Sequence, residues 1–216
     1  MMRILSSAPN EWIKRLAERT RQFAALDVTA EERRELEAWL IEQFVRATLE
    51  LEQIDSTNAL RAVITRVNAE GQRALLTAEL LIELGGDLRT TDDDRSTAQV
   101  RAGYLAQAVA NACDWFAADS FAELNPVEQA AIVWLRLASL EPFAQANQAT
   151  ALVAASLFTL RAGLPPVIIQ PQTQAALQQA IAEAEHMNMQ PLVELIAEAL
   201  SSTLDEMIGL VKRART

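Results

Sequence analysis

The sequence is almost without cysteine, histidine and tyrosine, each of which occurs once among its 216 residues. A single cysteine, Cys113, excludes an internal disulfide and favours a reduced, cytoplasmic setting. The single histidine, His186, has no neighbouring cysteine or paired acid with which to complete a zinc-type ligand set. We therefore expect no metal site, and we interpret Cys113 as a core thiol and His186 as a surface or capping residue.

Glycine and long hydrophobic runs are also scarce. The chain has six glycines and is rich in Ala, Leu, Glu, Gln and Arg, which favour helices over strands and predict an all-α fold. Its most apolar stretch, residues 151–169, is interrupted by an arginine, a glycine and two prolines. A transmembrane helix needs about 20 predominantly apolar residues. Near the start, the apolar pair Ile4-Leu5 is too short for a signal-peptide core. We expect neither a membrane span nor an export signal.

Basic charge is in the minority. The 19 lysines and arginines stand against 29 acids and give a formal net charge of −10. No basic cluster with interleaved aromatic residues offsets this charge, so the chain would repel a phosphate backbone, and we expect no nucleic-acid partner. Because 50% of the residues are hydrophobic and the length suits one core, we expect a single domain over residues 1–216.

Apolar positions recur with a helical period along most of the chain. N-terminal helices are expected over about residues 10–83 and a core over about 95–208, separated by a polar loop. The expected helices lie at about 12–26, 30–51, 59–83, 96–116, 126–140, 150–160, 172–186 and 191–208. The helices at 126–140 and 150–160 are nearly all apolar, so they should be buried at the centre, on either side of a short loop. Only residues 166–170 are compatible with a strand.

The loop between these two central helices carries a family resemblance. The segment Leu140-Glu-Pro-Phe-Ala-Gln-Ala-Asn-Gln-Ala-Thr-Ala-Leu152 resembles the Fic motif, His-Pro-Phe-x-Asp/Glu-Gly-Asn-Gly-Arg-x-x-Arg. Its matching residues are Pro142, Phe143 and Asn147. The segments 124–140, 160–169 and 189–196 are similar to the family's helix before the motif, its exit segment and its terminal helix. The resemblance covers about residues 36–208 and implies a Fic (Fido)-like helical fold.

Fic proteins transfer AMP from Mg-ATP to a hydroxyl group, and the resemblance implies where each chemical role would fall here. The position of the family's general base, a histidine, is Glu141, and that of its magnesium-binding acid is Gln145. Its phosphate-cradling glycines correspond to Ala146 and Gln148, on either side of Asn147, and its two phosphate-binding arginines to Ala149 and Leu152. Because the metal ligand and both cations are replaced by uncharged residues, binding of Mg-ATP and transfer of AMP are not expected.

Some Fic proteins also have an inhibitory helix with the pattern Ser/Thr-x-x-x-Glu-Gly/Asn. The segment Leu51-Glu-Gln-Ile-Asp55-Ser56 lies at the corresponding place, and Asp55 approximates the acid of the pattern. Since the arginine that this acid would pair with is missing, we interpret Asp55 and Ser56 as a helix break without an inhibitory role.

The resulting hypothesis is a catalytically degenerate Fic-like protein that acts as a binding or regulatory module, through a protein partner or self-association. One alternative is a transferase for a nucleotide or other phosphate compound, with Glu141 as base or metal ligand and Asn147 orienting an anion. A second alternative is a homo-oligomeric helical scaffold. The enzyme should show polar side chains converging beside Glu141, whereas the scaffold should have its loop packed shut by Phe143, Gln145 and Gln148.

Overall fold

The computed structural model describes residues 11–52, 57–71, 73–88, 104–143 and 145–216. Every regular element in these ranges is a helix, so the prediction of an all-α fold is confirmed. The elements are α1 (Glu11–Ala24), α2 (Ala30–Leu51), α3 (Thr57–Glu70), α4 (Ala78–Asp87), α5 (Tyr104–Phe116), α6 (Asp119–Ala122), α7 (Pro126–Leu140), α8 (Asn147–Arg161), the 3-10 turn η1 (Pro171–Thr173), α9 (Gln174–Glu185) and α10 (Gln190–Ala214). None of the helices in the described ranges combines the length and apolarity that crossing a membrane requires.

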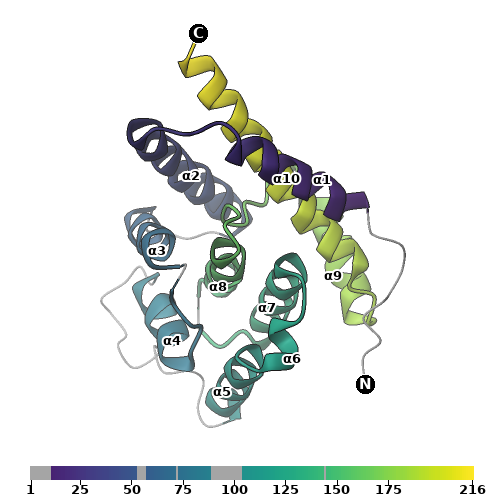
Figure 1. Ribbon diagram of the computed structural model, residues 1–216. Coiled ribbons are helices and arrows are strands. Elements are labelled where there is room, and N and C mark those ends of the chain that lie inside the picture. Colours follow the sequence, from purple (N-terminus) through teal and green to yellow (C-terminus); the bar gives the residue numbers. More distant parts are fainter. Residues whose placement is uncertain (1–10, 53–56, 72, 89–103, 144) are drawn as a thin grey trace.

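Helices α7 and α8 pack against each other at the centre of the fold, as their composition predicted (Figure 1). Every residue of α8 from Ala149 to Leu160 is buried. Its few hydroxyl groups bond locally: the Ser156 hydroxyl donates to the Leu152 carbonyl (2.9 Å) and accepts the Val167 amide (3.0 Å). Residues 165–169, which follow α8, are thereby held against the core as a buried segment that is neither helix nor strand.

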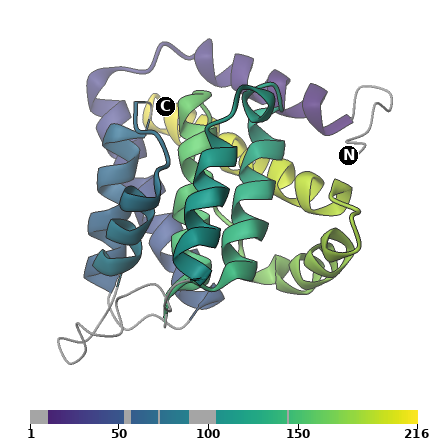
Figure 2. The same cartoon turned by 90° about the horizontal axis from the view of Figure 1, so that it is seen from below.

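The other helices surround this pair. Helices α2, α3 and α4 lie on one side of α8, and α10, with α1 and α9 alongside it, lies on the other (Figures 1 and 2). Two ion pairs join α1 to α10 in parallel order, Arg15 to Glu198 (2.6 Å) and Arg19 to Asp205 (2.8 Å). Helix α8 itself packs against α7, α3 and α4, and its buried surface explains why its composition is apolar on all sides.

Several helix boundaries agree with the sequence and others differ, since α8 begins at Asn147 rather than about 150 and α10 ends at Ala214 rather than about 208. Capping boxes form at Thr29 with Glu32 and at Asn125 with Glu128, at the starts of α2 and α7. The single helix expected over 59–83 was wrong, because α3 ends at Glu70 and α4 begins after Thr77, whose side chain accepts the Leu80 amide. The short helix α6 was not predicted, and the expected start of a helix at residue 96 lies outside the described residues.

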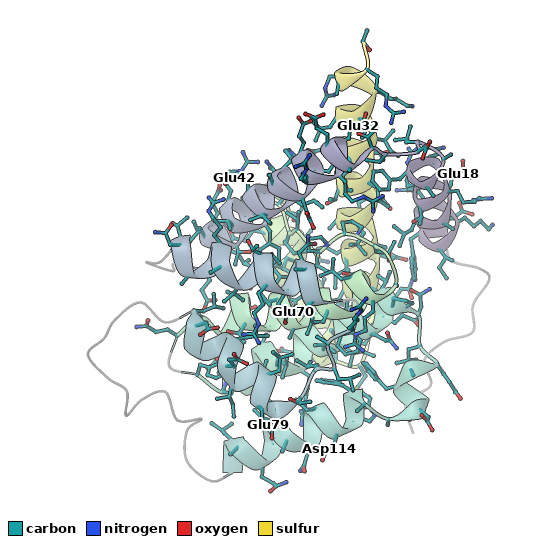
Figure 3. The ribbon with its side chains drawn as sticks, turned by 60° about the vertical axis from the view of Figure 1, so that its left-hand side comes forward. Glu18, Glu32, Glu42, Glu70, Glu79 and Asp114 are labelled. Carbon is teal, nitrogen blue, oxygen red and sulfur yellow. The ribbon has the colours of Figure 1, made fainter. Side chains whose placement is uncertain are left out.

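Arg215 fastens the end of α10 to the loop between α1 and α2. Its guanidinium bonds the Glu32 carboxylate (2.7 and 2.9 Å) and the carbonyls of Leu26 and Asp27. Figure 3 shows Glu32 near the start of α2, beside the end of α10. The hydrogen bond from Arg215, with that from the Thr29 amide, lowers the pKa of Glu32 from 4.5 to about 2. This contact links the stability of the fold to pH.

We expect Arg215→Ala to lower the urea midpoint of unfolding at pH 7. A carboxyl with a depressed pKa stabilises the fold fully above its unfolded value of 4.5, and this contribution is lost as the pH falls towards 2. The midpoints of the native protein and Arg215→Ala should therefore converge between pH 4.5 and 2. Arg213→Ala is the control, since Arg213 is exposed and has no ion pair in the described part of the chain. An equal loss in both variants at pH 7 would contradict the prediction.

Candidate functional site

The loop that connects α7 to α8 is turned by two residues in the left-handed region. Glu141 ends α7 with φ 43°, and Ala146 begins α8 with φ 59°. Residues other than glycine rarely adopt this conformation, because the Cβ atom crowds the backbone. The surrounding contacts must therefore fix the loop, and two of them involve Phe143.

The Phe143 ring is buried against α4. The contact is made at Gly85, where an added Cβ would lie 2.4 Å from the ring Cζ atom and 2.6 and 2.7 Å from the two Cε atoms. No side chain fits between the helix and the ring. A glycine at position 85 is therefore required for Phe143 to pack as it does.

The side chain of Asn147 closes the loop onto its own backbone. Its Oδ1 atom accepts the Phe143 amide (2.9 Å), and its Nδ2 atom donates to the Phe143 carbonyl (2.9 Å). Both ends of the amide are thus used within the loop. The sequence identified Asn147 as a possible anion-orienting residue. In this structure its side chain instead stabilises the loop by bonding to the Phe143 backbone.

A carboxylate from another helix lies at the N-terminus of α8. Glu52, the residue that follows α2, accepts the Ala149 amide through its Oε2 atom (2.9 Å). Burial raises the pKa of Glu52, and the backbone amides of Ala149, Asn147 and Gln148 act in the opposite direction. The amides and the positive end of the helix dipole make this place suitable for an anion. In this chain, its own Glu52 supplies that anion.

The structure brings the predicted loop residues together at one place, but with different exposure. Pro142, Phe143, Ala146, Ala149 and Leu152 are buried; Gln148 is partly buried, and Glu141 and Gln145 are exposed. Ala149 and Leu152, the positions of the family's arginines, are 0% and 1% exposed. Both side chains therefore lie in the hydrophobic core.

Glu52 was missed by the sequence interpretation, which considered Asp55 and Ser56 instead; both lie outside the described residues. A signal was present, since Thr48-Leu-Glu-Leu-Glu52 has the spacing Ser/Thr-x-x-x-Glu of the inhibitory pattern. Thr48 lies one helical turn before Glu52 and is fully buried, and its hydroxyl has no hydrogen-bond partner among the residues that the structure describes. The match to the pattern is incomplete, because Gln53 stands where the family has glycine or asparagine.

The remaining candidates have structural roles. Cys113 is buried on α5, and burial raises the pKa of its thiol to about 11, so little of the reactive thiolate exists at neutral pH. His186 is exposed at the end of α9, where its Nδ1 atom lies 2.8 Å from the Ala182 carbonyl. Within the ranges that the structure describes, no three His, Cys, Asp or Glu side chains are grouped so that they could hold a metal ion.

Comparison with known proteins finds a family that part of this chain resembles. The model of the Fic/DOC family matches residues 70–159, which include α7, the loop and most of α8. Two curated relatives are protein adenylyltransferase fic-1 of Caenorhabditis briggsae, 29% identical over 109 residues, and protein adenylyltransferase Fic of Drosophila willistoni, 32% identical over 92 residues. These alignments cover 50% and 43% of this chain but only 22% and 18% of the relatives. The chain thus corresponds to about a fifth of their length.

Solved structures show the same fold. Fic-1 of C. elegans (residues 134–508, E274G) superposes with a TM-score of 0.81 at 17% identity, over 93% of this chain and 72% of that chain. A Fic-domain signalling protein of Bacteroides thetaiotaomicron superposes with a TM-score of 0.80 at 13% identity, over 92% and 97%. The resemblance to the Fic family that the sequence predicted is confirmed.

Proposed function

We propose that this chain, a Fic-family chain by its match at residues 70–159 and by its fold, does not transfer AMP but acts as a binding or regulatory module. The observation that carries the proposal is the bond from the Ala149 amide to the Glu52 carboxylate. The anion position at the start of α8 is occupied by a group of the chain itself. A triphosphate would have to displace Glu52 before it could reach these amides.

Charge at the loop supports the same conclusion. Glu52 and Glu141 are the ionisable side chains at the helix N-terminus and at the position of the family's histidine, and both are acids. Ala149 and Leu152 bring no positive charge, and both are packed in the core. A triphosphate would therefore meet like charge, whereas the end of a helix contributes only about 0.3 to 2 kcal/mol towards an anion. The module would act without Mg-ATP.

The competing hypothesis is a transferase that uses Glu141 as base or metal ligand and Asn147 to orient an anion. It requires both side chains to be available to a substrate. Asn147 would have to release the Phe143 backbone before it could orient an anion. Glu141 is exposed and available, but no cation is supplied at the arginine positions. We therefore favour action through a protein partner or a second copy of the chain. The buried, reduced Cys113 suits a cytoplasmic setting for this role.

Calorimetric titration with Mg-ATP, together with a radiolabelled AMP-transfer assay, tests the proposal on the native protein and on Glu52→Ala. We expect neither binding nor transfer in either protein, because removing the carboxylate restores no cation and no metal ligand. Glu50→Ala is the matched control, since Glu50 is an exposed acid in the last turn of α2, two residues before Glu52. AMP transfer by the native protein, or transfer that appears only in Glu52→Ala, would establish the competing transferase instead.

A further inference from the structure

A groove lies between α9 and α10, away from the motif loop in sequence and sharing no residue with it. Figure 1 shows these two helices side by side, with α1 running along the other part of α10. The groove encloses about 710 Å³, which is within the range of pockets that hold ligands. Its apolar lining consists of Ile168, Ala176, Ala180, Pro191, Leu195 and Ala199. The groove therefore offers apolar surface to an occupant.

The charged residues that line the groove are all acids. Glu183 contributes from α9, and Glu194 and Glu198 contribute from α10, where they are one helical turn, about 6 Å, apart. Glu183 accepts the Asn188 side-chain amide (3.1 Å) and Glu194 that of Gln190 (2.7 Å), so their partners are neutral. Negative charge thus remains on both sides of the groove.

One acid of the groove, Glu198, already forms an ion pair with a basic side chain of the protein itself. Arg15, which comes from α1, donates through its Nη1 atom to the Glu198 Oε2 atom at 2.6 Å. A guanidinium from a separate helix laid along α10 therefore reaches a carboxylate of the groove. Glu183 and Glu194 have no such partner among the described residues. The groove has room for further basic side chains.

We propose that this groove binds a basic segment of another protein, which places apolar side chains on the groove floor and lysine or arginine side chains on Glu183 and Glu194. Apolar lining and acidic rims are complementary to an amphipathic helix or turn with basic flanks. A small organic cation would satisfy the carboxylates but would leave the apolar floor uncovered. The inference does not depend on the proposed loss of AMP transfer.

The test uses a fluorescein-labelled, capped peptide of leucine and lysine in an amphipathic helical pattern as probe, with fluorescence anisotropy as readout. The variant Glu183→Gln/Glu194→Gln removes two charges from the groove but keeps an oxygen acceptor at each position. The variant Glu123→Gln/Glu206→Gln is the control, since it changes the net charge equally at two exposed acids elsewhere. We expect the groove variant to weaken binding by about tenfold or more and the control by less than about twofold.

A third variant, Ala176→Phe, places a large side chain in the groove. Because Ala176 is exposed on α9, this substitution should leave the packing of the core unchanged. It should also weaken binding of the peptide by about tenfold or more. Equal weakening in the groove and control charge variants, or unchanged affinity in Ala176→Phe, would overturn the proposal. Spermine is the probe for a small polycation, and spermine binding as tight as that of the peptide would overturn it as well.

Discussion

Gly85→Ala is expected to lower the free energy of unfolding by about 1 to 3 kcal/mol, whereas Gly86→Ala should raise it by about 0.5 to 1 kcal/mol. The neighbouring glycines share a helix but differ in what an added methyl group meets. At Gly85 the Cβ atom would overlap the Phe143 ring at 2.4 to 2.7 Å, and at Gly86 it would meet nothing within 4 Å. Urea unfolding of the two variants beside the native protein measures both signs.

Phe143 itself tests the cause of this difference. Phe143→Ala should lower the free energy of unfolding by about 3 to 5 kcal/mol, because the ring is buried and its loss leaves a cavity under the motif loop. In the double variant Gly85→Ala/Phe143→Ala the overlap no longer exists, so the loss should be smaller than the sum of the two single losses. Additive losses would show that Gly85 acts on stability through something other than the ring.

Glu52→Gln is expected to raise the free energy of unfolding at pH 8, and this gain should disappear as the pH falls to 4.5. Burial raises the pKa of Glu52 in the fold above its ordinary value of 4.5. A carboxyl with a raised pKa stabilises the fold below the unfolded pKa and loses that contribution as the pH rises through the folded pKa. Glutamine keeps an oxygen acceptor for the Ala149 amide without the desolvated charge.

Glu52→Ala separates the hydrogen bond from the charge. Alanine leaves the Ala149 amide without its acceptor, so we expect Glu52→Ala to be less stable than Glu52→Gln by about 0.5 to 2 kcal/mol at every pH between 4.5 and 8. Denaturant unfolding at several pH values provides both comparisons. A Gln variant less stable than the native protein at pH 8 would mean that the ionised Glu52 stabilises the helix N-terminus more than its burial costs.

Much of the fold was predictable because its signals are local. The helices predicted over 30–51 and 126–140 begin where the sequence placed them, and capping boxes form there at Thr29 and Asn125. The central position of α7 and α8 followed from their nearly continuous apolar composition. The break between α3 and α4 was missed, because the apolar pattern continues on both sides of it.

At the candidate site, local pattern located the loop but not its contacts. Pro142, Phe143 and Asn147 marked the segment, yet nothing in the sequence indicates that Asn147 bonds to the Phe143 backbone. Glu52 is 97 residues from Ala149, and no periodicity or composition relates the two. The inhibitory pattern was the available signal, and it depended on recognising Thr48 and Glu52 without the glycine or asparagine that should follow.

The sequence by itself determined that the chain is helical, that two apolar helices form its centre, and which chemical groups the motif loop lacks. These properties depend on residue types and on spacings of a few positions, which helix geometry converts directly into a buried face. Only the tertiary structure decided that Glu52 occupies the N-terminus of α8, that Gly85 makes room for Phe143, and that α9 and α10 enclose an acidic groove. Such contacts join distant segments, and their geometry is set by the packing of whole helices rather than by any local pattern.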